Sequence, residues 1–166
     1  MTPSTAHHQE AETLSSLTAV SHAPSEVLKN AAFWPDVDLE DLRTSVRLTD
    51  NLPLARLRHL ALEAMARVND ELRRWQEEKQ ADGYLSLDQI PCDCLAGEPV
   101  LVSRYRRAVY CTTRALIVES YRDIDTTREG EKHAEALALQ ADALWRDSQW
   151  ALRDVQGLPR YLTEIV

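Results

Sequence analysis

The stretch LARLRHLALEAMARVNDELRRW, residues 54–75, decides the fold class of this chain. Its apolar residues recur at alternating intervals of three and four positions, which places them on one face of an α-helix. They are Leu54, Leu57, Ala61, Ala64, Val68, Leu72 and Trp75. Pro53 precedes the stretch, where its missing N–H is harmless, and Asp82-Gly83 provides a stop. The pattern therefore predicts one long amphipathic helix that ends near Gly83.

Three more helices are predicted on either side of this one. A short helix over 39–48 begins after Asp38, whose side chain is a good N-terminal cap. A long helix starts near Pro99 and runs to about Asp123, with apolar residues on more than one face, which is typical of a helix in the middle of a bundle. A last helix follows the capping residues at 125–127 and ends at Gly157. Its buried face is predicted to consist of Ala134, Leu137, Ala141, Leu144, Ser148, Ala151 and Val155.

These elements predict an all-α fold, an antiparallel helix bundle of three long helices and one short helix over residues 33–157. Residues 1–32 are rich in Ser, Thr, Ala, His and Glu without a lasting period, and are predicted to form a flexible N-terminal arm. Residues 158–166 follow Gly157 and are interrupted by a proline, so they are predicted to form an extended C-terminal tail. The long connection at 83–99 is expected to be a contact surface.

Length and composition are those of one soluble globular domain. The chain has 166 residues, of which 44% are hydrophobic and 28% charged, so an apolar core needs no disulfides. The formal net charge of -8 argues against free-standing binding to nucleic acid. No apolar run is long enough for a membrane-spanning helix. The odd number of cysteines, three, argues against a disulfide framework and favours a reducing compartment.

No constellation of residues indicates catalysis or metal binding. Cys92-Asp93-Cys94 has one residue between its thiols, and neither a second pair nor a nearby His completes a zinc site. His59 and His133 fall on different predicted helices, and neither a His-Glu-x-x-His motif nor a repeated Glu-x-x-His pair occurs. A phosphate-binding glycine loop and a Gly-x-Ser-x-Gly elbow are also missing. We therefore predict that the chain is not an enzyme and carries no cofactor and no metal.

The tail and a few helical positions are the candidate partner-binding residues. In the tail they are Arg160, Tyr161, Leu162, Ile165 and Val166. The tail either packs as a strap on its own bundle or inserts into a groove of a partner, and the residues alone favour neither. Arg104, Arg106 and Arg107 are expected to pair with acidic residues of neighbouring helices, the alternative being a clamp on an acidic partner. Trp145 and Trp150 cannot both face one narrow core stripe, so one of them, taken to be Trp150, is expected at a protein interface.

Seven short segments follow one another along the chain in an order that is more specific than any one of them. They are Phe33-Trp-Pro-Asp-Val-Asp38, Ala55-Arg-Leu-Arg58, Val68-Asn-Asp-Glu-Leu72, Tyr105-Arg-Arg-Ala-Val109, Tyr121-Arg-Asp-Ile-Asp125, Leu144-Trp-Arg-Asp147 and Gln156-Gly-Leu-Pro-Arg160. In this order they resemble the head completion (or head stabilisation) protein family of contractile-tailed phages, often called the GPL family. The first 30 residues take no part in the resemblance.

The resemblance implies a structural protein of the virion, located at the head–tail junction (the neck) and made in the host cytoplasm. Proteins of this type are similar to helical adaptors that form a ring, commonly twelvefold, beneath the portal protein. Such a ring closes the DNA-filled capsid and offers a platform to the next neck or tail protein, while genomic DNA passes through the lumen without specific binding. The resemblance also implies that the C-terminal tail reaches the portal. The alternative is a small soluble helical regulator that binds another protein, because it needs the same bundle and the same apolar surface.

Overall fold

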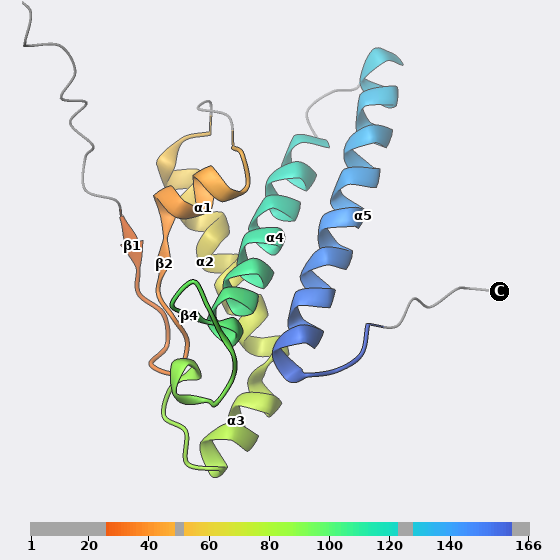
Figure 1. Cartoon of the computed structure of the whole chain (residues 1–166). Coiled ribbons are helices and arrows are strands. Elements are labelled where there is room, and N and C mark those ends of the chain that lie inside the picture. Colours follow the sequence, from red (N-terminus) through yellow and green to blue (C-terminus); the bar gives the residue numbers. More distant parts are fainter. Residues whose placement is uncertain (1–25, 49–51, 123–127, 161–166) are drawn as a thin grey trace, which may run out of the picture.

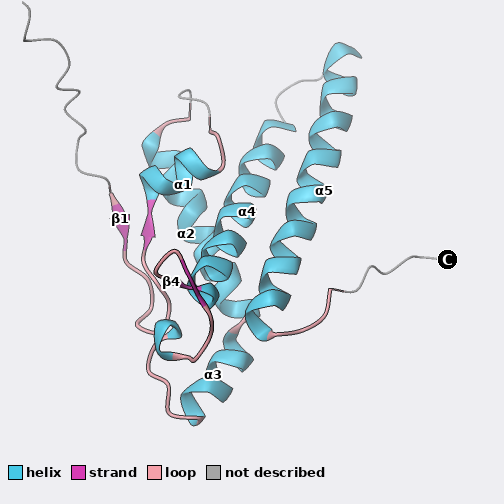
Figure 2. Ribbon diagram, in the orientation of Figure 1, coloured by secondary structure: helices cyan, strands magenta, loops and turns pink. Residues whose placement is uncertain are grey.

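The computed structural model of the chain describes residues 26–48, 52–122 and 128–160. Its helices are α1 (Leu39–Ser45), α2 (Leu54–Glu71), α3 (Arg73–Ala81), α4 (Val100–Arg122) and α5 (Arg128–Gln156), with a short 3-10 helix at Leu87–Gln89. Strands β1 (Val27–Leu28) and β2 (Val37–Asp38) form one antiparallel pair, and β3 (Cys94–Leu95) and β4 (Glu98–Pro99) form another (Figures 1 and 2). The described chain is therefore mostly helical, as predicted, with two small sheets that the sequence did not indicate.

Helix α4 lies between α5 and α2 and packs against both (Figure 1). Side chains on its different faces, among them Tyr105, Tyr110 and Val118, are almost completely buried. Packing on two neighbours removes apolar surface from water on more than one side of the helix, which is the main favourable contribution to folding. This arrangement agrees with the apolar residues that the sequence places on more than one face of this helix.

The helix predicted from 54 to 82 is divided at Leu72. The described part of the chain therefore has three long helices and two short ones, α1 and α3, where the sequence predicted a single short helix. Leu72 is fully buried, with φ −93° and ψ 1°. The turns before it pack on α4, whereas Trp75 after it packs on Phe33 and Trp34, so the helix is interrupted where the packing partner changes. Leu54, predicted on the buried face, is 51% exposed.

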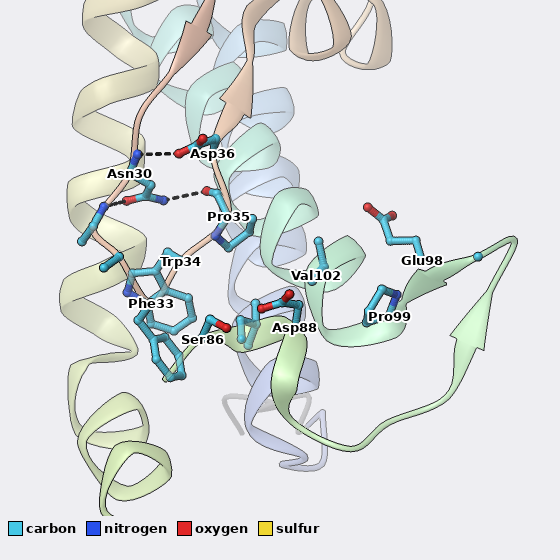
Figure 3. A pocket seen from close by; sticks show the side chains of 14 residues that line it. Asn30, Phe33, Trp34, Pro35, Asp36, Ser86, Asp88, Glu98, Pro99 and Val102 are labelled. Carbon is cyan, nitrogen blue, oxygen red and sulfur yellow. Dashed lines mark hydrogen bonds between the residues drawn. The ribbon is translucent and has the colours of Figure 1, made fainter. Parts of the chain in front are cut away.

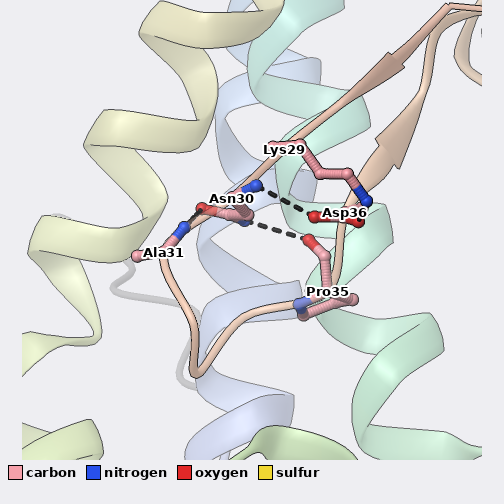
Figure 4. Close-up of polar contacts among 5 residues, drawn as sticks. All are labelled: Lys29, Asn30, Ala31, Pro35 and Asp36. Carbon is pink, nitrogen blue, oxygen red and sulfur yellow. Dashed lines mark hydrogen bonds and ion pairs between the residues drawn. The ribbon is translucent and has the colours of Figure 1, made fainter.

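The folded part begins before Phe33, the residue at which the sequence placed its start. Strand β1 pairs with β2 and buries Leu28. In the turn between them, the backbone N–H of Asn30 donates to Asp36 Oδ1 (3.0 Å), and the Asn30 side-chain amide donates to the Pro35 carbonyl (3.0 Å) (Figure 4). Two-residue strands are too short for a period-two pattern to appear, which is why the sequence did not indicate them. The earlier part of the predicted arm, 1–25, lies outside the described residues.

Trp34 is the centre of an aromatic cluster that ties this turn to the helices. Its ring stacks on Tyr105 at 4.8 Å between centroids, and Trp75 stacks on it at 6.3 Å. The Tyr105 hydroxyl donates to Asn69 Oδ1 (2.6 Å) and accepts from the Asn30 amide (2.7 Å). Burial raises the pKa of Tyr105, so its hydroxyl stays protonated and can donate. The cluster therefore joins the β1–β2 turn to α2, α3 and α4.

Three helix ends predicted from the sequence are confirmed. The Asp38 carboxylate accepts two N–H groups from the first turn of α1, at 2.8 and 3.1 Å. Gly83 follows the end of α3, and Gly157 follows α5 with φ +69°, a left-handed conformation that favours glycine. The capping residues predicted at 125–127 fall outside the described residues.

Candidate partner interface at the end of the last helix

The C-terminal end of α5 holds the first charged residue of the predicted tail. Arg160 donates from Nε to Asp154 Oδ1 (2.9 Å) and also forms an ion pair with the same carboxylate through Nη2. Its guanidinium carbon lies 5.5 Å from the ring centroid of Trp150, and that of Arg146 lies 5.4 Å from the same centroid. These distances are those of cation–π contacts. Arg160 and Trp150, both predicted to bind partners, therefore contact each other.

Helix α4 brings two more of the predicted residues to the same place. Arg104 donates to the main-chain carbonyl of Asp154 (3.0 Å), in the last turn of α5, where carbonyls lack helical partners. The hydrogen bond from Arg160 holds the pKa of Asp154 below its ordinary value, and the charges of Arg160, Arg104 and Arg107 act in the same direction. We call Arg104, Arg107, Arg146, Arg160, Asp154 and Trp150 the arginine corner. It is a locally basic patch on a chain whose formal net charge is -8.

A groove of about 460 Å³ opens between α1, α4 and α5 and shares Arg107 with the arginine corner. Its lining residues are Asp41, Ser45, Val46, Ser103, Arg106, Arg107, Tyr110, Cys111, Arg114, Leu144 and Asp147. The Tyr110 hydroxyl donates to the Asp41 carboxylate. Burial raises the pKa of the Cys111 thiol. The groove therefore combines apolar side chains with three arginines and two aspartates, an excess of one positive charge, which suits an apolar segment that carries one acidic residue.

The three neighbouring arginines of α4 have different surroundings. Arg104 meets a main-chain carbonyl of α5, and Arg106 forms an ion pair with Glu98 of β4 at 2.8 Å. Arg107 is exposed and lies beside the Cys111 thiol. Arg104 and Arg107 act electrostatically on the Asp154 carboxylate of the neighbouring helix α5, whereas Arg106 pairs with a carboxylate of the hairpin and not of a helix. The other predicted partner-binding residues, Tyr161, Leu162, Ile165 and Val166, fall outside the described residues.

Sequence reasoning missed the group that brings the arginine corner together, the carboxylate of Asp154. It stands four residues after Trp150, a spacing that puts both on one helix face. That spacing was a usable signal. The sequence holds no comparable signal for the approach of Arg160 to the same face, because that approach depends on the direction of the chain after Gly157.

A second depression, of about 560 Å³, lies between the turn at 33–36, the 3-10 helix and the β3–β4 hairpin (Figure 3). The hairpin leads directly into α4, and its Glu98 is ion-paired with Arg106 of that helix. It exposes the thiols of Cys92 and Cys94 and leaves Leu95 69% exposed. Across the described ranges, no three His, Cys, Asp or Glu residues gather closely enough to hold a metal ion. The contact surface predicted over 83–99 remains a prediction.

Comparison with known proteins decides the family. The family described as phage head completion protein (GPL) matches residues 28–166, which is most of the chain. The chain belongs to this family. A relative, the head completion/stabilization protein of Escherichia phage P2, is 39% identical over 134 residues, which cover 81% of this chain and 79% of the relative. No solved structure matches.

The match to the head completion family begins at Leu28, the second residue of β1, and so starts before the first resembling segment, which contains β2. The arginine corner, the groove and the residues after Arg160 all lie within it. The family consists of structural phage proteins and is not an enzyme family. The resemblance read from the seven ordered segments is confirmed. None of the described helices is both long enough and apolar enough to cross a membrane.

Proposed function

We propose that this head completion protein assembles into a ring of twelve copies beneath the portal, at the head–tail junction of the virion. The ring closes the DNA-filled capsid and presents a docking platform to the next neck or tail protein. Genomic DNA passes through the lumen without specific binding. The C-terminal tail makes the contact with the portal.

The family match over residues 28–166 carries this proposal, because a head completion role is what the family's description and the phage P2 relative's name have in common. The net charge of -8 supports free passage of DNA, since an acidic wall repels phosphates and gains nothing from counterion release. The arginine corner supports the role of the tail. Because Arg160 is bound to Asp154, the residues after it start from a defined point on the surface of the bundle.

Co-sedimentation of the purified protein with its cognate portal, followed by electron microscopy, tests the proposal. We expect a ring stacked on the tail-facing end of the portal. Deleting 158–166 should abolish docking while circular dichroism shows an unchanged helical fold. Deleting 1–25 is the matched control and should leave docking intact.

Two results would change the assignment. If the protein that lacks 158–166 still docks on the portal at the normal level, the tail does not make the portal contact. A folded, intact protein that does not bind the portal at all would favour the small soluble helical regulator.

A further inference from the structure

We infer that the groove between α1, α4 and α5 is the binding site of the chain's own C-terminal segment, residues 161–166, before the protein meets any partner. The segment reads YLTEIV. This inference goes beyond the proposed function, because it concerns the unassembled protein and holds whether or not the tail later contacts a portal.

The segment starts at one end of the groove. Arg160 is bound to Asp154, and Asp147 stands seven residues earlier, two turns along the same face of α5. Asp147 lines the groove. The hydrogen bond to Asp154 raises the pKa of Arg160, and the negative charge of Asp147 acts in the same direction, which puts Arg160 near both carboxylates. Arg160, the last described residue, therefore lies at the end of the groove that Asp147 lines.

The segment is also long enough to fill the groove. Six extended residues span about 20 Å. From Asp154 to Leu144, the groove residue farthest along α5 from the tail, the helix advances about 15 Å. On α4, Arg107 and Arg114 are separated by about 10 Å along the axis. A chain that leaves Arg160 along the groove passes both arginines.

The chemistry of the segment matches the lining. The segment has one acidic residue, Glu164, and no Lys or Arg. Arg106 of the groove is already paired with Glu98, which leaves Arg107 and Arg114 to meet Glu164, in a lining that also holds the carboxylates of Asp41 and Asp147. Arginine forks bind carboxylates well. The apolar groove residues Val46, Tyr110 and Leu144 suit the apolar residues of the segment, which are Tyr161, Leu162, Ile165 and Val166. Because the segment is tethered, its effective concentration at the groove is of order millimolar, and modest contacts suffice.

A paired-cysteine cross-link tests the site in the full-length chain. The background carries Cys92→Ser, Cys94→Ser and Cys111→Ser. One variant adds Thr163→Cys and Ser45→Cys, because Ser45 is exposed and lines the groove. The matched control adds Thr163→Cys and Gln80→Cys, because Gln80 is exposed on α3 and does not line the groove.

With a short bismaleimide in dilute solution, we expect a cross-link within one chain that forms at least tenfold faster in the groove variant than in the control. Equal rates in the two variants would overturn the inference. Cross-links between two chains would overturn it too, because they would mean that the groove receives the tail of another copy. The absence of any cross-link in the groove variant would also overturn the inference.

Charge reversal provides an independent check. Arg107→Glu with Arg114→Glu, added to the groove variant, should slow the intramolecular cross-link several-fold, because Glu164 would then meet like charges. Arg74→Glu is the control, since the Arg74 side chain is 92% exposed on α3. An equal effect of both reversals would overturn the role of the arginines. Circular dichroism must show the same helical fold in every variant.

Discussion

The hydroxyls of Thr112 on α4 and Ser148 on α5 hydrogen-bond to each other at 2.7 Å, inside the interface between the two longest helices. Each residue is 2% exposed. Ser148 Oγ also lies 3.5 Å from the Ala108 carbonyl. A buried polar pair of this kind is favourable only while both partners are present, because a single buried hydroxyl loses its water and gains nothing in return.

We therefore expect Thr112→Val alone to lower the free energy of unfolding by about 1–2 kcal/mol, since Ser148 is left with the long contact to Ala108. Adding Ser148→Ala should recover most of that loss, because neither hydroxyl is then buried without a partner. Urea denaturation of the two single variants and the double variant measures the coupling. Simple addition of the two single effects would contradict the paired role of the hydroxyls.

Trp34 should be among the side chains most important for stability. Its ring stacks on Tyr105 and Trp75, and its Nε1 donates to Gln76 Oε1 at 3.2 Å. We expect Trp34→Ala to lower the free energy of unfolding by about 3–5 kcal/mol, measured by urea denaturation. Leu139→Ala is the control, because Leu139 is 72% exposed, and it should change stability by no more than about 0.5 kcal/mol. A small effect at Trp34 would mean that the aromatic cluster is not part of the cooperative core.

Arg160→Ala should raise the pKa of Asp154 towards its ordinary value, because the hydrogen bond from Arg160 is the main cause that lowers it. A lowered carboxyl pKa in the folded state stabilises the fold above the unfolded-state value, and this contribution is lost as pH falls through the folded-state value. The free energies of unfolding of the intact protein and the variant should therefore differ at neutral pH. They should converge in acid, below the ordinary carboxyl pKa of 3.8. NMR titration of the carboxyl carbons measures the shift. Lys29→Ala is the control, because it removes a partner of Asp36 instead, and it should leave the pKa of Asp154 unchanged.

The β3–β4 hairpin turns through two residues with positive φ, Ala96 at +51° and Gly97 at +82°. A left-handed conformation is unfavourable for alanine and readily adopted by glycine. Ala96→Gly is expected to raise the free energy of unfolding by up to about 1 kcal/mol, and Gly97→Ala to lower it by at least as much. Beyond its two chain neighbours, no atom lies within 4 Å of a Cβ added at Gly97, so the effect of the substitution would be backbone strain. Thermal unfolding of the two variants measures the difference, and a gain from both would contradict the assigned turn.

The candidate site was only partly predictable from the sequence. The sequence indicates Trp150 because two tryptophans five residues apart cannot share one helix face, and Arg160 because it follows a helix stop. That Arg104, Trp150 and Arg160 gather at Asp154 depends on how α4 and α5 align and on the direction of the chain after Gly157. No pattern within one element contains that information. The groove beside them depends on three elements that lie far apart in the chain.

The sequence by itself determined the mostly helical class, the stops at Gly83 and Gly157, the cap at Asp38 and the membership of the head completion family. These are local properties, because helical periodicity, capping and ordered motifs are set by residues a few positions apart. Only the tertiary structure decided the division of the second predicted helix at Leu72, the β1–β2 pair that buries Leu28, and the arginine-lined groove. Each of these depends on contacts between residues distant in the chain, and burial against those partners outweighs local preference.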